Sequence, residues 1–458
     1  MTDADTESFG RSAPASLSLP FSFAFPGIWW LLAAGLVLRL GLAFMPGFGV
    51  DIGAFHAWSL RLADISAWNF YEPGYFADYA PGYLYVLWFI GELNQVFHFG
   101  ADTYPYVLKI TPIVADVGSA YLLYRFLSGQ RESIRLGAAA IYLFFPAALL
   151  IGAVWGQVDS LSALFLLLSI YLISRNRPLE GSLAFVAGFV IKPQLIAALP
   201  FLAFWIIRDY PPAWLKPGAS LNLRTLVPPL WLKITAAGFG LMLLLILPFF
   251  PDNPLNFIDH LQDSANFYEY NSLNAYNFWS IDGFFRPDTV DWGSTGLSQY
   301  TWGVILFALA TVSVLVVMRN RREDWALALG SALCLLAFYL FLTRMHERYL
   351  FPFFLPFLAA CVLAQSRALW AVFVLLGVIH FLDLYFAYSY YPFVLPPQGT
   401  APDEPFFRPM WDLITDLDIL GSGLEGYLVL SVAATLCFPL LLAITHRLPR
   451  RPKGSAAA

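Results

Sequence analysis

The sequence is poor in charge: Asp, Glu, Lys and Arg make up 12% of its 458 residues, whereas 59% are hydrophobic. Its mean hydropathy of +0.64 lies far from that of a soluble domain and is typical of a polytopic membrane protein. No Lys/Arg-rich patch is interleaved with polar or aromatic residues, so we expect no nucleic-acid partner. The few charged residues near apolar segments therefore become the ones that need an explanation.

Cysteine is also scarce, because the chain has only three, and Cys334, Cys361 and Cys437 all fall inside apolar segments. We therefore expect no disulfide framework. The absence of any Asn-x-Ser/Thr acceptor is compatible with a bacterial source. The polar N-terminus lacks the basic opening of a signal peptide, so we expect the first apolar segment to be retained as a span. These observations predict a multi-pass protein of the bacterial plasma membrane.

Long apolar segments predict an all-α bundle of about 12 transmembrane helices over residues 26–446, since a span needs about 20 apolar residues. Lys192-Pro193 interrupts the run 180–207, which predicts two short spans or a re-entrant hairpin there. Residues 1–25 and the basic tail 447–458 are predicted to be disordered and cytoplasmic. The expected spans are 26–46, 105–127, 134–152, 160–175, 180–191, 193–207, 231–250, 299–318, 325–343, 348–364, 368–390 and 425–446.

The placement of Lys and Arg predicts the orientation. Most of the 26 basic residues fall in the connections that are cytoplasmic if the N-terminus is inside. The opposite connections, 47–104, 251–298 and 391–424, are acidic and aromatic instead. This bias requires that 82–99 does not span, so we expect it to be an amphipathic helix on the outer interface.

Two carboxylates stand at the outer edge of this bundle. Asp51 closely follows the first span, and Asp159 lies between the third and fourth spans in the motif AVWGQVDSL. Ionisable groups at a membrane boundary are costly, so two on one face indicate a site. A carboxylate there could take a proton as a general base. The alternative is that each residue caps the helix that follows it.

Basic residues on the same face predict a site for an anion. Lys192 lies where the chain reverses, and Arg344, His346 and Arg348 lie in LTRMHERYLFP at the outer end of the ninth span. Arg matches phosphate geometry, and His can add a hydrogen bond. The alternatives are a snorkelling Lys192 and a Glu347–Arg348 or Asp–Arg pair that only joins helices. His346-Glu347 does not extend to the zinc motif His-Glu-x-x-His.

Amide and aromatic side chains in the outer loops are candidates for contacting a polar substrate such as a sugar, although they could equally pack the loops. Buried charges elsewhere, at Arg39, Asp116, His380 and Asp383, are predicted to face the bundle interior and pair with one another. The candidate sugar or acceptor contacts are His56, Tyr79, Gln157, Asn274, Asn277 and Trp279.

The ordered set of Asp51, YAPGYLY, AVWGQVDS, FVIKPQ, NAYNFW and TRMHERY resembles the GT-C class of integral-membrane glycosyltransferases, and most closely the bacterial relatives of the GPI-anchor mannosyltransferases. The resemblance covers about residues 26–446. It implies juxtamembrane helices in the first outer loop and inverting transfer of a sugar, mannose or a similar hexose or pentose, from a polyprenyl-phosphate donor. The acceptor would be a lipid or glycan at the extracytoplasmic face. Membrane lipids would surround the protein there.

By the same resemblance, Asp51 would be the general base, and Asp159 would orient the acceptor or help to hold a cation. Lys192, Arg344, His346 and Arg348 would bind the donor phosphate. Asp51 does not stand in an Asp-Asp or Asp-x-Asp pair, so Mg²⁺ or Mn²⁺ would need ligands from Asp159, Glu72 or Asp78 as well, and no cofactor is assigned.

Two other function classes fit a polar membrane bundle. A transporter or flippase of a lipid-linked sugar would place ionisable residues near mid-membrane on interrupted helices and would often carry inverted repeats. Here the charges gather at one face and no repeat is evident. A structural scaffold would tolerate the replacement of Asp51.

Overall fold

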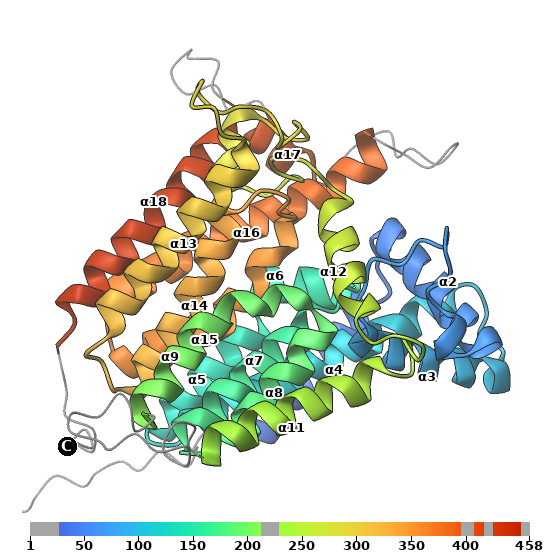
Figure 1. Ribbon diagram of the computed structural model, residues 1–458, viewed down its shortest axis with the longest axis horizontal. Coiled ribbons are helices and arrows are strands. Elements are labelled where there is room, and N and C mark those ends of the chain that lie inside the picture. Colours follow the sequence, from blue (N-terminus) through green and yellow to red (C-terminus); the bar gives the residue numbers. More distant parts are fainter. Residues whose placement is uncertain (1–26, 212–228, 395–406, 416–424, 450–458) are drawn as a thin grey trace, which may run out of the picture.

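A computed structural model describes residues 27–211, 229–394, 407–415 and 425–449 of the chain (Figure 1). Regular secondary structure in these ranges is entirely helical. Seven of the helices are long and apolar enough to cross a membrane, or eight if one bent pair forms a single span. This is compatible with the predicted multi-pass helical protein, but the predicted number of 12 spans is not confirmed. The predicted disordered segment 1–25 and most of the tail 447–458 lie outside the described residues.

The first half of the chain follows the predicted segments closely. Pro146 begins a new helix after Phe145, and the apolar segment 132–155 is bent by 47° there because proline cannot continue the preceding helix. The elements are α1 (Ile28–Leu42), α2 (Gly49–Ile65), η1 (Ala67–Asn69), α3 (Pro81–Phe97), α4 (Thr103–Phe126), α5 (Glu132–Leu143), α6 (Pro146–Ala148), the π-helical η2 (Leu149–Trp155), α7 (Asp159–Ser174) and α8 (Pro178–Ile191).

The predicted break at Lys192-Pro193 is confirmed. Lys192 has an extended backbone, with φ −138° and ψ 102°, as the residue before a proline prefers. The remaining elements are η3 (Pro193–Ala198), α9 (Leu199–Asp209), α11 (Pro229–Ile246), α12 (Asn256–Asn266), η5 (Trp279–Asp282), α13 (Gln299–Met318), α14 (Asp324–Phe341), η6 (Glu347–Leu350), α15 (Phe351–Ala364), α16 (Arg367–Val394), α17 (Arg408–Thr415) and α18 (Gly426–Arg447).

Helices α2 and α3 form a pair beside the bundle, at the right of Figure 1. Their backbones touch at Gly91, where an added Cβ would lie 2.1 Å from the carbonyl oxygen of Ser59. Helix α3 spans 17 residues and is not among the helices that could cross a membrane. The prediction of a helix near 82–99 is thus confirmed, and its place on the outer interface stays a prediction.

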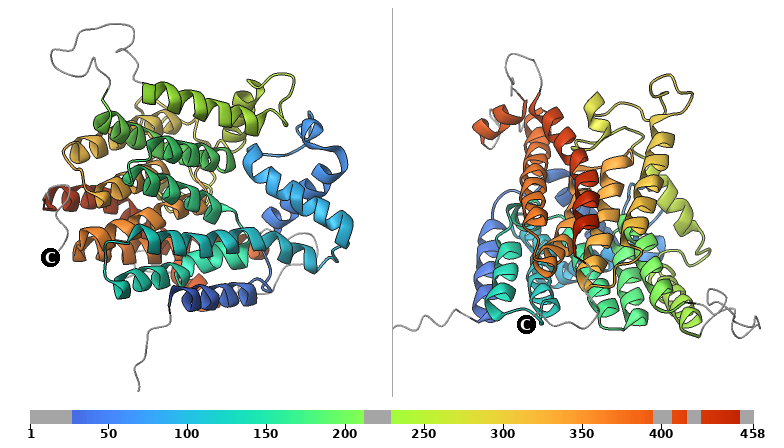
Figure 2. Two further views of the ribbon diagram at one scale, coloured as in Figure 1. Left: turned by 90° about the horizontal axis from the view of Figure 1, so that it is seen from below. Right: turned by 90° about the vertical axis from the view of Figure 1, so that its left-hand side faces the viewer.

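The two ends of the bundle differ in charge. Basic connections meet at one end: Arg175 donates to the carbonyl of Phe126 at 3.1 Å, and Arg208 donates to the carbonyl of Arg321. Arg321 in turn donates to the carbonyl of Thr445 at 2.9 Å. We call this the basic end. Helices α2, α3 and α12 lie at the other end (Figures 1 and 2), which we call the site end.

The predicted pairing of interior charges holds for two of the four residues. Arg39 and Asp116 are fully buried and form an ion pair of 3.1 Å. Asp383 instead accepts a hydrogen bond of 2.6 Å from the Tyr339 hydroxyl, and the His380 ring stacks on Phe354 with no hydrogen-bond partner in the described residues. The prediction was wrong for His380 and Asp383, because Oδ2 of Asp383 bonds to a tyrosine hydroxyl instead, and its Oδ1 has no hydrogen-bond partner in the described residues.

Candidate functional site

Asp51 joins two segments that are far apart in the sequence. Its Oδ2 accepts hydrogen bonds from Nε1 of Trp155 at 2.6 Å and from Nε2 of Gln157 at 2.9 Å. The N-cap of α2 is Phe48, and Asp51 lies inside the first turn. The capping alternative is therefore wrong for Asp51, whose carboxylate faces the connection between η2 and α7 rather than its own helix end.

A tight turn after η2 aims Trp155 and Gln157 at Asp51. Gly156 ends η2 with φ +88°, and an added Cβ there would lie 2.7 Å from the side chain of Ile52. Only glycine adopts this backbone without strain in so little space. The backbone N–H of Phe48 donates to the carbonyl of Trp155 at 3.1 Å, and the two rings stack. The start of α2 and the end of η2 are thus fixed to each other.

Lys109 supports the segment that leads into α2. This residue of α4 is 1% exposed, and its ammonium donates to the carbonyls of Ala43 at 3.0 Å and Met45 at 2.6 Å. Its side chain also lies against Gly156. Lys109 therefore positions both segments that meet at Asp51, a role that the sequence did not reveal.

Asp159 and Lys192 form a second buried pair. The Nζ of Lys192 lies 3.5 Å from Oδ2 of Asp159, with the two residues 4% and 2% exposed. The ammonium also lies over the rings of Tyr79 and Tyr349, at 4.9 and 5.7 Å from their centroids. Lys192 thus has an acidic partner that the sequence did not indicate, and it is not a snorkelling residue. Val158 is the N-cap of α7, so the capping alternative is wrong for Asp159 too.

Arg348 connects three site residues. Its Nη1 donates to Oε1 of Glu347 at 2.8 Å and lies 3.3 Å from Nδ1 of His346, while its Nη2 is 4.0 Å from Oδ1 of Asp51. A guanidinium has only donors, so Nδ1 of His346 accepts and the proton of the neutral ring belongs on Nε2. Burial, and then the charges of Arg348 and Lys192, lower the pKa of His346 well below 6.5.

Arg344 points away from this cluster. Its guanidinium donates to both oxygens of Asp288, at 2.7 and 3.3 Å, and to Oδ1 of Asn266 at 2.6 Å. Asn266 is the last residue of α12, so Arg344 ties that helix to the loop 267–298. The role of Arg344 in binding a donor phosphate stays a prediction, but the other three basic residues are the ones that lie together.

The first loop adds a tyrosine and a carboxyl group to the site. The Tyr79 hydroxyl donates to Oε1 of Gln157 at 2.7 Å, which orients the amide toward Asp51. Burial raises the pKa of Asp78, against the opposing effect of Arg348 and together with that of Asp51. His56 lies apart, with its ring 4.2 Å from that of Tyr104, so its contact with a sugar stays a prediction.

The amides of the loop 267–298 divide into two kinds. Asn277 donates to the carbonyl of Tyr339 and accepts from the backbone N–H of Trp279 and Ser280. Trp279 donates to the carbonyl of Phe341 at 2.7 Å. Asn274 is also fully buried, but its Oδ1 and Nδ2 have no hydrogen-bond partner in the described part of the chain. Its backbone lies beside that of His346.

The cluster contains more acidic than basic groups. Asp51, Asp159 and Glu347 share Lys192 and Arg348, and Asp78 lies close enough to affect them. Within the described residues no three His, Cys, Asp or Glu side chains come together in a way that could hold a metal ion. Binding of Mg²⁺ or Mn²⁺ stays a sequence-based prediction.

Three residues at the centre were not among the predicted site residues: Trp155, Glu347 and Tyr349. The Glu347–Arg348 pair that the sequence offered as an alternative is present, at 2.8 Å, whereas nothing in the sequence indicated that Tyr349 faces the cluster. No protein-family model matches the chain, and no curated protein matches it either. The geometry of the site is therefore the main evidence about function.

Proposed function

We propose that this protein is an inverting glycosyltransferase that moves a sugar from a polyprenyl-phosphate donor to a hydroxyl of a lipid or glycan acceptor at the extracytoplasmic face. The observation that carries the proposal is the environment of Asp51. Asp51 is 9% exposed, and its carboxylate lies between two neutral hydrogen-bond donors and a guanidinium. A buried, oriented carboxylate beside cationic groups suits a general base next to an anionic leaving group.

The two oxygens of Asp51 have different surroundings. Oδ2 accepts two hydrogen bonds, from Trp155 and Gln157, whereas the nearest cationic atom to Oδ1 is Nη2 of Arg348 at 4.0 Å. That separation is longer than a hydrogen bond. Oδ1 is therefore the oxygen that can accept the proton of an acceptor hydroxyl, while Oδ2 keeps the carboxylate in place.

In the proposed step, the acceptor oxygen attacks the anomeric carbon as its proton passes to Oδ1 of Asp51. The new bond joins the acceptor oxygen to the anomeric carbon, and the bond from that carbon to the donor phosphate oxygen breaks. The electron pair leaves with the polyprenyl phosphate, and Lys192 and Arg348 stabilise its charge. Direct displacement inverts the anomeric carbon and forms no sugar–enzyme bond.

The distribution of charge supports the extracytoplasmic placement. The connections at the basic end contain Arg175, Arg208 and Arg321, each of which donates to a backbone carbonyl of another connection or helix end, and the site lies at the other end. Basic connections favour the cytoplasmic side of bacterial membranes. A donor with a long hydrocarbon tail and a charged head would then bind with its tail among the helices and its phosphate at Lys192 and Arg348.

The decisive experiment measures transfer of a radiolabelled sugar from defined polyprenyl-phosphate donors to a lipid and glycan extract by the purified protein. Asp51→Asn removes the base at nearly constant volume, and we expect turnover to fall roughly 100- to 10,000-fold while donor binding persists. Asp64→Asn is the matched control, because Asp64 is an exposed residue of the same helix. Equal transfer by the wild type and Asp51→Asn would refute the assignment.

One observation favours the flippase alternative. The helical run α8–η3 is interrupted at Lys192, where a buried ion pair joins the break to Asp159, and interrupted helices with ionisable groups are typical of transporters. Protein-dependent movement of a fluorescent polyprenyl-phosphate sugar across liposomes, without any glycosylated product, would favour this function over transfer.

A further inference from the structure

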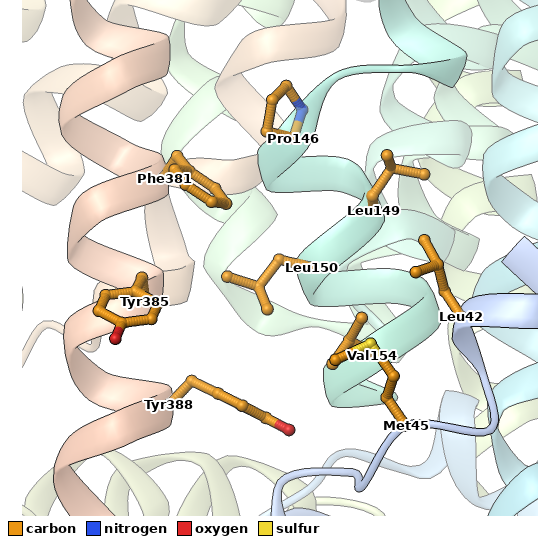
Figure 3. A pocket seen from close by; sticks show the side chains of 9 residues that line it. All are labelled: Leu42, Met45, Pro146, Leu149, Leu150, Val154, Phe381, Tyr385 and Tyr388. Atoms are coloured by element: carbon orange, nitrogen blue, oxygen red, sulfur yellow. The ribbon is translucent and has the colours of Figure 1, made fainter. Parts of the chain in front are cut away.

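An apolar cavity of about 260 Å³ lies between the end of α1, the η2 helix and α16 (Figure 3). Leu149, Leu150 and Val154 of η2 form one wall. Phe381, Tyr385 and Tyr388 of α16 form the opposite wall. The volume is slightly below the roughly 300–1,000 Å³ of sites for drug-sized ligands, so it suits a segment of a single hydrocarbon chain.

The cavity offers no free hydrogen-bonding side chain in its described lining. Its two hydroxyls are already engaged, since Tyr385 donates to the carbonyl of Phe407 at 2.7 Å and Tyr388 donates to that of Pro46 at 2.6 Å. A sugar or phosphate placed here would lose its hydrogen bonds to water without replacement, which is costly. The lining therefore favours a hydrocarbon chain over a polar head group.

The cavity adjoins Trp155, which separates it from Asp51. Val154 lines it, and the next residue, Trp155, donates its hydrogen bond to Asp51. The ring of Tyr388 lies 6.0 Å from that of Trp155. The η2 helix is a π-helix. This form is rare in proteins overall, but where it occurs it is often found at functional sites. One short helix thus contributes both an apolar wall of the cavity and the indole that holds the Asp51 carboxylate.

The Lys192 side of the site lies elsewhere. Lys192 ends α8, which packs against α7, α3 and α11, whereas the cavity lies at α1. In the left panel of Figure 2, α1 and α11 are at opposite edges of the bundle. If the hydrocarbon chain of a ligand occupies the cavity, its head group would lie nearer to Asp51 than to Lys192.

From these relationships we infer that the cavity holds the hydrocarbon chain of the acceptor, which is therefore a lipid and not a free glycan. The inference rests on the proposed function, in which Asp51 takes the proton of the acceptor hydroxyl. An acceptor anchored in the cavity places a head-group hydroxyl next to Asp51. The donor phosphate then binds from the side of Lys192 and Arg348, so that the two substrates approach the carboxylate from different faces of the bundle.

Cysteine protection tests the occupant without requiring turnover. Leu149→Cys places a thiol in the cavity wall, against a background in which Cys334, Cys361 and Cys437 are buried. In nanodiscs, we expect hexadecyl glucoside to slow maleimide labelling at least fivefold, while ethyl glucoside and undecaprenyl phosphate leave it unchanged. Leu436→Cys, on an exposed apolar face of α18, is the matched control. Protection by undecaprenyl phosphate, or by no probe, would overturn the inference.

Filling the cavity gives a second, independent test. Leu150→Trp should reduce transfer to extracted lipid acceptors at least tenfold, while the donor KM and the slow hydrolysis of the donor by water stay at wild-type values. A raised donor KM would show that the cavity holds the donor chain, and unchanged transfer would show that it holds neither; both results refute the inference. If the wild type neither transfers sugar from nor hydrolyses any donor, the proposed function fails, and the cysteine experiment still decides what the cavity binds.

Discussion

The indole N–H of Trp155 donates to Oδ2 of Asp51 at 2.6 Å, although the two residues are 104 positions apart. This bond crosses from the end of η2 to the first turn of α2 and holds a nearly buried carboxylate in one orientation. Charge-assisted hydrogen bonds of this kind are among the stronger ones in proteins. The relationship makes Trp155 a positioning residue for Asp51.

Trp155→Phe keeps most of the apolar contact with Phe48 and Tyr388 but removes the donor to Asp51. A hydrogen bond to a charged group contributes about 1.5–3 kcal/mol, so we expect kcat to fall roughly 10- to 100-fold. The KM for the donor should change little, because Trp155 does not contact Lys192 or Arg348 through any observed bond. Steady-state kinetics of sugar transfer measure both constants.

Trp325→Phe is the control for this substitution, because Trp325 is a buried tryptophan at the start of α14, near the basic end. It should leave kcat unchanged. If Trp155→Phe also retains full kcat, the indole does not position the base and the orientation of Asp51 depends on Gln157 alone.

Arg348→Lys should weaken donor binding. Lysine keeps the positive charge but loses the planar fork that contacts Glu347, His346 and Asp51 together. We expect the donor KM to rise roughly tenfold, the equivalent of about 1.4 kcal/mol, and Lys192→Gln to act in the same direction. Arg367→Lys, exposed at the start of α16, provides the control. Unchanged donor KM in both site variants would remove these residues from the phosphate site.

Arg344→Ala should act on stability instead. The substitution leaves Asp288, which is fully buried, without its bidentate partner, and an unpaired buried charge costs about 3–5 kcal/mol. Arg177→Ala, which removes an exposed pair with Glu180, should cost at most about 1 kcal/mol. Thermal unfolding in nanodiscs compares the two. A raised donor KM with an unchanged unfolding temperature would show that Arg344 binds the donor phosphate instead.

The lowered pKa of His346 predicts that the stability of the protein depends on pH. Burial lowers its pKa well below 6.5 in the folded protein, so below about pH 6.5 the unfolded chain binds a proton that the folded chain does not. Stability contributed by neutral His346 is present above that pH and is lost as pH falls toward the folded-state pKa. His346→Gln should therefore lose less stability than the wild type between pH 7.5 and 5.5.

Unfolding temperatures at the two pH values give this difference directly. His98→Gln is the control, because His98 is exposed at the end of α3, and it should follow the wild type. Identical slopes for His346→Gln and the wild type would mean that His346 titrates alike in the folded and unfolded states.

The positions of the helices were largely predictable from the sequence, because apolar length and proline report directly on helical segments. The break at Lys192-Pro193 and the helix at 82–99 both follow from such local signals. The number of spans was not predictable, because α1, α7 and α8 are shorter than a full bilayer crossing. Length alone does not decide whether such a helix crosses, tilts or re-enters.

Side-chain partners were much less predictable. The sequence placed Asp51, Asp159, Lys192 and Arg348 at one face, but it gave no partner for Lys192 and no sign that Lys109 supports the segment before α2. It also grouped Arg344 with Arg348, although the backbone at Arg344 has φ +64° and turns its side chain toward Asp288. Such pairings depend on tertiary geometry between distant segments, which periodicity and motif spacing do not encode.

The two asparagines of NAYNFW should separate binding from folding. Asn277→Ala removes bonds to Tyr339, Trp279 and Ser280 inside the core, and unsatisfied buried groups cost about 1–3 kcal/mol each, so we expect a clear loss of stability. Asn274→Gly removes no observed side-chain bond, and glycine tolerates its φ of +63°. The unfolding temperature of Asn274→Gly should stay near that of the wild type.

The activities of the two variants then decide what Asn274 does. Its amide is buried next to His346 without a hydrogen-bond partner in the described residues, and such a group calls for a partner in a ligand, a bound water or an ion. We therefore expect Asn274→Gly to raise the KM for the sugar donor or the acceptor roughly 10-fold in a protein of normal stability. Full activity in Asn274→Gly, with wild-type KM for both substrates, would show that the Asn274 amide contacts neither substrate.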